Sequence, residues 1–467
     1  MMVKGLRPPI GFIVQSPMNL MRCFYPGALG SSWSNRFQRQ MTMLKAVGPG
    51  KPPPPNVNWR GDWGGQPGDR GSGGDRLLAH MRETDNVRSG RTNLDRDSAT
   101  YTRFVSYNVL SSSLSTPTTF PECDPDALLE ENRLQKLTIK LEREITFRSV
   151  VCLQEVSIKW SGALHTFFSK NGYHFVFSGY GNRFNGYMGV GIAVPVHDFD
   201  ILDVDLTRVA DVKQWPRSPK EELSGISKVW KDFTSTRLGK AMFPQERPPD
   251  SAYVGARKRH NIVVFARLRS KRNGHVVCVA NYHMPCAYMQ QGLMVIHLSL
   301  VVNQVQKLCG EDPVVFCGDF NMQPDQGLYK MVVEGIVPED LDPEVPAYDS
   351  WLPTAPEKLL STYKEFTGSE PEFTNYAKTG DKPEFCATLD YIFISPDLEV
   401  VDVESLPTQE EVAGPLPNEE EPSDHLLIAA TIRISDKQEK KPENEGKDKQ
   451  GESISDSEAE PNEENNA

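Results

Sequence analysis

The sequence lacks the features that mark several common classes of protein. Its eight cysteines form no CxxC pair, and Cys152, Cys278 and Cys317 lie inside apolar runs, so we expect buried free thiols rather than a zinc or disulfide framework. No run of about 18 apolar residues occurs, and no membrane span is predicted. A glycine-rich phosphate loop, a Ser-His-Asp order and the surroundings of a catalytic cysteine are also missing. Enzyme classes built on those motifs are therefore excluded.

Acidic residues are absent from the first 61 positions, where lysine and arginine occur among serine, methionine and aromatic residues. This composition is typical of an organellar transit peptide, and a basic leader without a targeting role is the alternative. Residues 48–76 are rich in glycine and proline, which predicts a flexible linker. We therefore interpret residues 1–100 as a basic, Gly/Pro-rich disordered leader with a candidate targeting segment. The expected location is intracellular, in the cytoplasm or the mitochondrion.

Negative charge is concentrated in the rest of the chain. The net charge is −12, but residues 1–100 contribute +7 and residues 436–467 contribute −6, which leaves −13 on residues 101–435. This acidic central region is unlike a general nucleic-acid binder, whose surface is basic. If it acts on phosphate groups, the positive charge must come from metal ions and a few local Lys or Arg residues. Residues 436–467 contain few apolar residues and are predicted to be an acidic disordered tail.

Between the two ends, the apolar pattern alternates between strand and helix periods. Strands are expected at 103–110, 149–154, 190–196, 261–269, 275–282, 314–317, 389–394 and 426–432, and helices at 128–145, 164–168 and 288–308. The Asn273-Gly274 pair predicts a hairpin between two of these strands. Residues 205–255 and 335–372 are interpreted as long irregular insertions, which often contact substrate. The alternation predicts an α/β domain.

Polar residues stand where the apolar strands end. They are carboxylate, amide and imidazole side chains: Asn108, Glu155, His283, Asp319, Asn321, Asp390, Asp424 and His425. Each of them alone could be a turn residue, a helix N-terminal residue or a satisfied core histidine. Together they predict one pole of a sheet where a site is assembled.

The side-chain types fit one chemistry. Carboxylates with Asn carbonyl groups form a hard oxygen site, which suits Mg²⁺ or Mn²⁺ rather than zinc. Imidazoles can bind or protonate phosphoryl oxygens, and a carboxylate can act as a base on water. The sequence therefore predicts a divalent-metal-dependent phosphodiesterase.

Six short motifs follow one another along the chain. They are Ser106-Tyr107-Asn108, Leu153-Gln154-Glu155, Asn281-Tyr282-His283, Gly318-Asp319-Phe320-Asn321, Leu389-Asp390-Tyr391 and Ser423-Asp424-His425. In this order the set resembles the endonuclease/exonuclease/phosphatase superfamily. The resemblance implies a four-layer α/β/β/α sandwich like that of DNase I, formed by one catalytic domain over residues 101–435. It also implies a Mg²⁺-dependent phosphoester hydrolase.

Within the superfamily, the chain most resembles the carbon-catabolite-repressor-type deadenylases and their relatives Angel, nocturnin and the 2′-phosphodiesterase. The resemblance lies in residues 132–135 with 151–156, residues 318–325, and residues 373–376 with 385–393. Residues 187–192 depart from it, because they read Tyr-Met-Gly-Val-Gly-Ile where the deadenylases carry an Asp-Gly-Cys-Ala-Ile-like strand. Adenine preference is therefore less firmly implied than hydrolase chemistry.

The resemblance also implies a role for each site residue. Glu155 would be the main metal ligand, supported by Asn108, and Asp424 would lie beside a metal. Asp319 would orient or deprotonate the attacking water.

The remaining residues would act on the phosphate and the base. Asn321 and His283 would hold phosphate oxygens, and His425 would contact the scissile phosphate. Asp390 would hydrogen-bond His425 and set its tautomer. Phe385 would stack on an adenine base, although ordinary core packing is the alternative.

These roles imply a 3′-5′ exoribonuclease of the deadenylase type, which acts on adenine-rich RNA 3′ ends with Mg²⁺, or with Mn²⁺ in its place. One alternative is a 2′,5′-oligoadenylate phosphodiesterase or a small-molecule (dinucleotide) phosphatase. A second alternative is a catalytically silent RNA-binding protein. No protein partner is indicated by the sequence.

Overall fold

The computed structural model describes residues 101–216, 251–341, 343, 346–412 and 414–434. All of them belong to one compact unit, Glu83–Ala467. The predicted leader, residues 1–100, and the predicted tail, residues 436–467, lie outside the described residues, so both stay predictions.

Two six-stranded mixed sheets form the centre of this unit. The first sheet has the strand order β13-β14-β1-β2-β4-β3, and the second has the order β5-β6-β7-β8-β12-β9. The strands of the first sheet are β1 (Tyr101–Asn108), β2 (Val150–Val156), β3 (Tyr173–Gly179), β4 (Gly189–Pro195), β13 (Glu399–Val403) and β14 (Ile428–Arg433). Those of the second are β5 (Phe199–Arg208), β6 (Ile262–Ser270), β7 (Val276–His283), β8 (Val314–Asp319), β9 (Leu360–Ser361) and β12 (Asp390–Ile394). Each sheet contains one parallel pair, β1 with β2 and β7 with β8.

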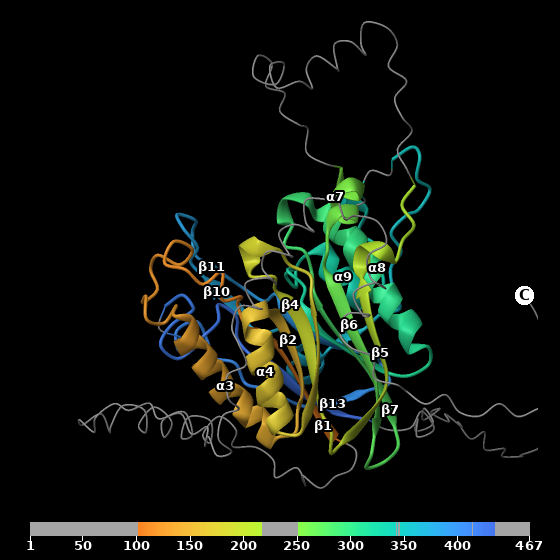
Figure 1. The fold of residues 1–467 in the computed structure, drawn as a ribbon. Coiled ribbons are helices and arrows are strands. Elements are labelled where there is room, and N and C mark those ends of the chain that lie inside the picture. The colour runs from red at the N-terminus through yellow and green to blue at the C-terminus, as the bar shows by residue number, and fades with distance from the viewer. Residues whose placement is uncertain (1–100, 217–250, 342, 344–345, 413, 435–467) are drawn as a thin grey trace, which may run out of the picture. The chain divides into compact units, whose positions relative to one another are not determined.

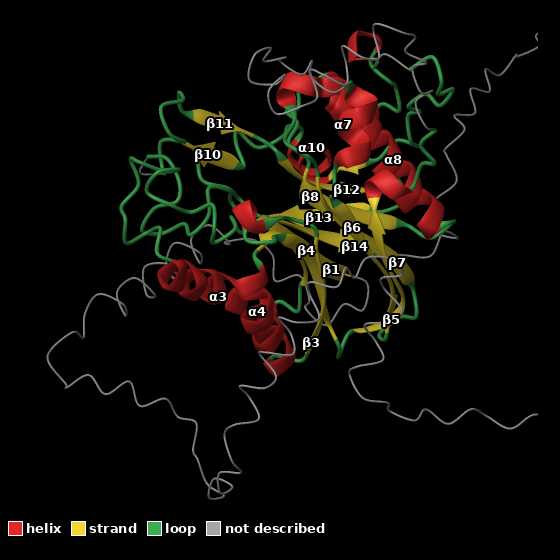
Figure 2. Cartoon of the chain, turned by 45° about the horizontal axis from the view of Figure 1, so that its top comes forward, coloured by secondary structure: helices red, strands yellow, loops and turns green. Residues whose placement is uncertain are grey.

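Helices cover the outer faces of both sheets (Figure 1, Figure 2). On the first sheet they are α3 (Glu130–Thr146) and α4 (Ile158–Lys170), and on the second α7 (Ala252–Lys258), α8 (Gln291–Cys309) and α9 (Gly327–Val333). The short helix α10 (Thr362–Thr367) and the two-stranded sheet of β10 (Asn375–Ala377) and β11 (Phe385–Ala387) complete the larger elements. The predicted four-layer α/β/β/α sandwich is confirmed.

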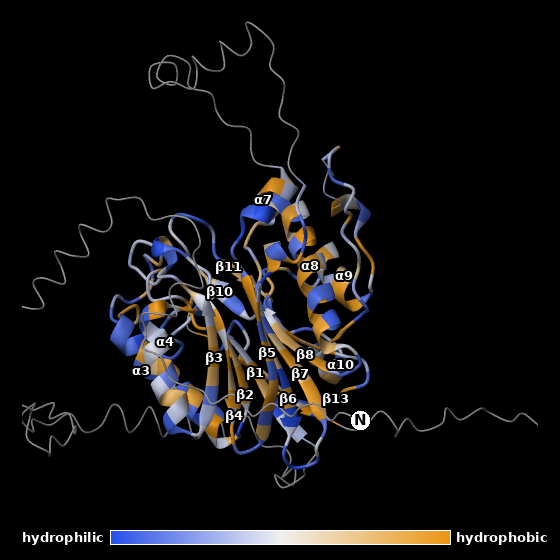
Figure 3. Ribbon diagram, turned by 45° about the vertical axis from the view of Figure 1, so that its right-hand side comes forward, coloured by the Kyte–Doolittle hydropathy of each residue, from blue (hydrophilic) through white to orange (hydrophobic). Residues whose placement is uncertain are grey.

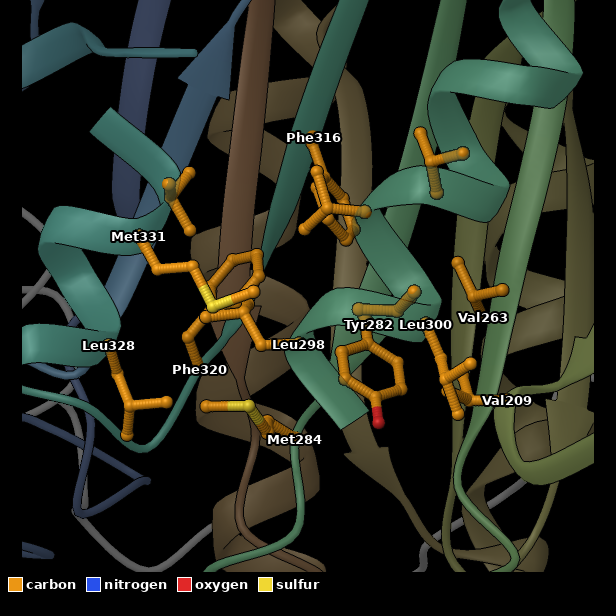
Figure 4. Close-up of a cluster of buried hydrophobic side chains, with 14 of the residues drawn as sticks. Val209, Val263, Tyr282, Met284, Leu298, Leu300, Phe316, Phe320, Leu328 and Met331 are labelled. Carbon is orange, nitrogen blue, oxygen red and sulfur yellow. The ribbon is translucent and has the colours of Figure 1, made fainter. Parts of the chain in front are cut away.

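Three apolar cores separate these four layers. Alternate residues of each strand point to opposite faces, so Phe104 of β1 enters the core between the sheets while Val105 packs under α3 and α4. In Figure 3 the sheet strands carry orange hydrophobic segments beside blue hydrophilic ones. In the third core, side chains of α8 and α9 meet the second sheet; Figure 4 shows Leu298 and Met331 beside Phe320.

One segment, Tyr288–Cys309, has the length and hydropathy of a membrane span among the described residues. It contains α8, and 67% of the tested window is buried inside the protein. A helix that is apolar on all sides is expected when core residues surround it, and α8 lies in the third core. The finding is weak evidence for a span.

The structure corrects two of the expected insertions. Within residues 205–255, β5 continues to Arg208 and α7 begins at Ala252. Within residues 335–372, β9 and α10 are regular. Strand β5 was not predicted from the sequence pattern for two reasons. It is an edge strand with exposed apolar residues, such as Leu202 and Leu206. A register shift between Ile201 and Asp203 also interrupts the alternation of its side chains.

Candidate active site

The strand ends that carry the polar residues meet at one edge of the two sheets. In the first sheet, Asn108 at the end of β1 pairs with Gln154 of the parallel strand β2, which places Glu155 next to it. In the second sheet, Asp319 pairs with His283 on one side and with Asp390 on the other. This register explains why residues distant in sequence come together.

Asn108 connects the acidic residues of both sheets. Its Nδ2 donates to Asp319 Oδ2 at 2.9 Å and to Glu155 Oε1 at 3.4 Å, and its Oδ1 accepts the Leu110 N–H at 3.0 Å. The second oxygen of Glu155 accepts the Ser111 N–H at 3.0 Å. In this arrangement the amide oxygen of Asn108 is already occupied, so a direct metal role for Asn108 stays a prediction.

Two predicted site residues adopt left-handed backbone conformations, which are uncommon for Glu and more readily adopted by Asn. The φ angle of Glu155 is 56° and that of Asn321 is 49°. At Glu155 the pairing of β2 with β4 also shifts register, between Leu153 and Val156. Such conformations cost about 1–3 kcal/mol each and persist where the surrounding structure enforces them, as at functional sites. Asn321 also donates its Nδ2 to the Met284 carbonyl at 2.9 Å.

His425 is held by a buried carboxylate. Its Nδ1 lies 2.7 Å from Asp390 Oδ2, and the Thr374 hydroxyl donates to the same oxygen at 2.7 Å. The predicted hydrogen bond between Asp390 and His425 is therefore present. The other ring nitrogen, Nε2, lies 3.8 Å from Asp319 Oδ2 and faces the site.

This environment favours a positive charge on His425. Burial alone would lower the pKa of His425, but Asp390, Asp424 and Asp319 together raise it well above its ordinary value. Burial also raises the pKa of Asp390, and the imidazolium beside it opposes that shift. These carboxylates favour the imidazolium form of His425, whose Nε2 also lies 3.4 Å from Asn108 Nδ2.

The second histidine, His283, has a different partner. Its Nε2 lies 3.4 Å from Asp319 Oδ2 and 3.9 Å from Glu155 Oε1, and its Nδ1 lies 2.7 Å from the hydroxyl of Tyr180. Burial raises the pKa of Tyr180 well above its ordinary value, so the phenol keeps its proton. Tyr180 was not predicted from the sequence.

Asp424 is placed by its backbone. Its carbonyl accepts hydrogen bonds from Asn375 Nδ2 and the Tyr376 N–H, both at 3.0 Å, and its Oδ1 is buried without a hydrogen-bond partner among the described residues. Burial raises the pKa of Asp424 to about 6; the charge of His425 opposes the shift and that of Glu155 adds to it. The negative charge of Glu155 thus disfavours ionisation of Asp424, and a cation between the two carboxyl groups would relieve this effect.

Arg133 of α3 fixes the loops around this carboxylate. It is fully buried, and it donates to the carbonyl oxygens of Val109, Leu110 and Pro422 at 2.6–2.7 Å. This role was not predicted from the sequence, although the spacing indicates it. Arg133 precedes Leu137 and Leu141 at intervals of four residues and therefore lies on the buried face of the helix.

Phe385 lies on the hairpin of β10 and β11. In β10, Asn375 bridges to His425, while Phe385 pairs with Ala377 at the far end of the hairpin and is 40% exposed. The structure therefore connects Phe385 to the site through β10 and leaves its ring accessible. Its contact with a base stays a prediction.

The donor set fits a metal ion. Ligand atoms of Asp319, Asp390 and His425 lie within 4.8 Å of one another, and all three residues are buried. The imidazolium form of His425 has no free lone pair, so the carboxylates are the metal-binding part of this group. Asp390 Oδ2 is already used by His425 and Thr374, whereas the Glu155 carboxylate and the unpaired Asp424 Oδ1 are nearby oxygen donors. Carboxylate oxygens are the ligands that hard divalent cations prefer.

Comparison with known proteins agrees with this geometry. Residues 86–425 match the Endonuclease/Exonuclease/phosphatase family, which is well over half of the chain. The chain belongs to this family. Relatives of the chain include proteins named as a phosphodiesterase and as a 3′-5′-exoribonuclease subunit.

Several relatives in the family are named proteins. Human 2′,5′-phosphodiesterase 12 is 28% identical over 353 residues, which cover 71% of this chain and 51% of that protein. The carbon catabolite repressor protein 4 homolog 4 of Arabidopsis thaliana is 33% identical over 195 residues, which cover 38% of this chain and 42% of that protein. The chain thus spans about half the length of the first of these relatives.

A solved structure shows the same fold. That of ANGEL2, described as a 2′,3′-cyclic phosphatase in complex with adenosine-2′,3′-vanadate, superposes with a TM-score of 0.53. The two proteins are 21% identical, and the match covers 72% of this chain and 96% of that one.

Proposed function

We propose that the protein is a Mg²⁺-dependent phosphodiesterase that removes nucleotides from adenine-rich RNA 3′ ends, as a 3′-5′ exoribonuclease of the deadenylase type. One observation carries the proposal: the Nε2 atoms of two histidines from different elements lie within 4 Å of the same Asp319 oxygen. A phosphate bound there would meet two N–H donors on one side and carboxylates on the other. Hydrolysis of a phosphodiester needs such an arrangement of charge stabilisers and a base.

Each residue has a defined task in this proposal. Asp319 orients the attacking water and accepts its proton. His425, kept protonated by Asp390, donates its Nε2–H to a phosphate oxygen and offsets the charge that develops there. His283 donates its Nε2–H to the phosphate as well. The P–O bond to the leaving oxygen breaks as the bond from water to phosphorus forms, and the departing oxygen takes up a proton from solvent.

Glu155 and Asp424 would hold Mg²⁺, or Mn²⁺, in this proposal. A bound divalent ion supplies Lewis-acid stabilisation of the phosphate oxygens and offsets the negative charge of these carboxylates. Residues 101–435 carry a net charge of −13, so a polyanionic substrate requires such local positive charge.

A second candidate substrate is 2′,5′-linked oligoadenylate. It is favoured by the relatives named 2′,5′-phosphodiesterase 12 from four mammals, whose 27–28% identity extends over 71% of this chain. Both candidates use the same hydrolytic site and differ in the linkage that is cut. Location in the cytoplasm or the mitochondrion remains a proposal that rests on the composition of residues 1–61.

Hydrolysis of three labelled RNAs tests the proposal. The full chain is incubated with Mg²⁺ and an RNA ending in an A tail, a mixed-sequence RNA, and 2′,5′-linked oligoadenylate. We expect stepwise shortening of the A tail, and Glu155→Gln should reduce it by about 10²–10³, the typical cost of losing one positioned charge stabiliser. EDTA should abolish it.

Other outcomes separate the alternatives. Cleavage of the 2′,5′-linked substrate alone would replace the deadenylase assignment by the second candidate. Equal cleavage of both 3′,5′-linked RNAs would remove the adenine preference. Activity that survives Glu155→Gln would show that the site has been misassigned, and binding of RNA without any hydrolysis would support the silent RNA-binding alternative.

A further inference from the structure

The loop between β3 and β4, residues 180–188, carries two exposed aromatic side chains. Phe184 is 80% exposed and Tyr187 is 51% exposed. Aromatic side chains normally bury most of their surface, and adjacent exposed ones mark contact sites for ligands or partners. We propose that this loop is a nucleobase-binding platform at the mouth of the active site; the proposal rests on the hydrolase function given above.

Phe184 lies in a loop whose backbone is held by local hydrogen bonds. The side chain of Asn182 accepts the Phe184 N–H at 2.9 Å, and Asn185 bonds back to the Asn182 N–H at 2.7 Å, which forms a reciprocal cap. Gly186 then turns the chain with a φ of 65°, and a Cβ atom there would come 2.6 Å from Ser113 Oγ. The loop therefore holds the Phe184 ring outward in one backbone conformation.

The same loop is bonded to both halves of the active site. Ser111 donates its Oγ–H to the Asn185 carbonyl at 2.8 Å, and its N–H to Glu155 Oε2 at 3.0 Å. At the start of the loop, the Tyr180 hydroxyl lies 2.7 Å from His283 Nδ1. Phe184 is thus one residue from Asn185, the partner of Ser111, and Ser111 in turn bonds Glu155. It is four residues from Tyr180, the partner of His283.

The ligand that fits this surface is the base of a single-stranded nucleic acid. An aromatic ring stacks on any base, and Arg183 beside it adds an exposed positive charge in a region whose net charge is negative. After His283, the residue that Tyr180 contacts, the chain continues to Tyr288 and Met289, which are 59% and 84% exposed. A single-stranded nucleic acid whose phosphate occupies the site can therefore place its flanking bases on apolar side chains.

Binding of labelled oligoadenylate and of its abasic analogue tests the proposal. Both are titrated against the full chain in a Glu155→Gln background, in which turnover should be about 10²–10³ slower during the measurement. Phe184→Ala should weaken binding of oligoadenylate by roughly 5- to 150-fold, the range for loss of one base–aromatic stack. Binding of the abasic analogue should not change, and Phe184→Trp should restore the affinity for oligoadenylate.

Phe366→Ala is the matched control. Phe366 is 46% exposed and lies on α10, which directly follows β9. Strand β9 pairs with the end of β12 that is far from Asp390. It should leave both affinities unchanged.

The possible outcomes distinguish this proposal from the proposed function. The platform is overturned if Phe184→Ala binds oligoadenylate as tightly as the parent chain does. It is also overturned if Phe184→Ala weakens binding of the abasic analogue as much as binding of oligoadenylate. If the wild-type chain hydrolyses no phosphodiester but Phe184→Ala still loses base-dependent binding, the proposed function fails and the platform stands.

Discussion

His283 and His425 point their Nε2 atoms at the same Asp319 oxygen but are oriented by different partners. Asp390, a carboxylate, can only accept a hydrogen bond, so it favours the imidazolium of His425. The phenol of Tyr180 keeps its proton and can donate to Nδ1 of His283. Among the described residues, carboxylate oxygens of Asp319 and Glu155 lie within 4 Å of His283 Nε2, which favours a proton on this nitrogen and an accepting Nδ1 opposite Tyr180.

Tyr180→Phe tests this positioning role. We expect kcat to fall by about 10- to 100-fold, the usual effect of losing the partner that orients an active-site imidazole, with little change in KM. Long-range ¹⁵N–¹H spectra of the labelled histidines should show that His283 loses its single Nε2–H tautomer. Tyr363→Phe is the control, because its hydroxyl donates to the Glu404 carbonyl at 2.8 Å and touches no site residue. An equal loss of activity in both variants would reduce Tyr180 to a packing residue.

At the level of the elements, two buried amides join the sheets next to the site. Gln154 of β2 donates to Asn281 Oδ1 of β7 at 2.8 Å, and Asn281 Nδ2 donates to the carbonyl oxygens of Leu153 and Gly191 at 2.9 and 2.8 Å. Both amides are fully buried. Because Gln154 directly precedes Glu155, and Asn281 lies two residues before His283, this bridge sets the spacing between the two halves of the site.

Asn281→Ala should therefore affect both stability and activity. The substitution removes one acceptor from Gln154 Nε2, which keeps its hydrogen bond to Ser106 Oγ, and one side-chain donor from each of two carbonyl oxygens. Each buried group left unsatisfied costs about 1–3 kcal/mol. Urea unfolding should show this loss, and kcat should fall further than the folded fraction accounts for. Asn303→Ala is the matched control, since Asn303 also bonds two backbone carbonyls but lies at the partly exposed surface of α8. A variant with normal kcat would show that the bridge stabilises the fold without aligning the site.

Strand ends could be predicted from the sequence because a polar residue after an apolar run is a local signal. Asn108 and Asp319 are of this kind. The fold was predicted from the order of the motifs, through their resemblance to a known superfamily. Tyr180 could not be found in this way, because its partner His283 lies 103 residues away and nothing in its own segment marks the contact. Arg133 has a local signal, but its partners come from two distant loops.

For the molecule as a whole, one histidine outside the site couples stability to pH. His297 of α8 is fully buried; its Nε2–H donates to the Ala256 carbonyl, and its Nδ1 faces the Tyr282 hydroxyl, both at 3.0 Å. Burial lowers the pKa of His297 from 6.5 to about 4. His297 therefore becomes protonated below about pH 6.5 in the unfolded chain, but only below about pH 4 in the folded chain.

Stability from His297 is present above its unfolded pKa and is lost as the pH falls towards 4. Linkage gives a loss of about 2–3 kcal/mol between about pH 7.5 and about pH 4.5. His297→Gln should remove this pH-dependent part, so the difference in unfolding free energy between wild type and variant narrows by that amount as the pH falls. Urea unfolding at both pH values measures it, with exposed His165→Gln as the control. A constant difference across the range would mean that His297 accepts its proton as readily in the folded protein as in the unfolded chain.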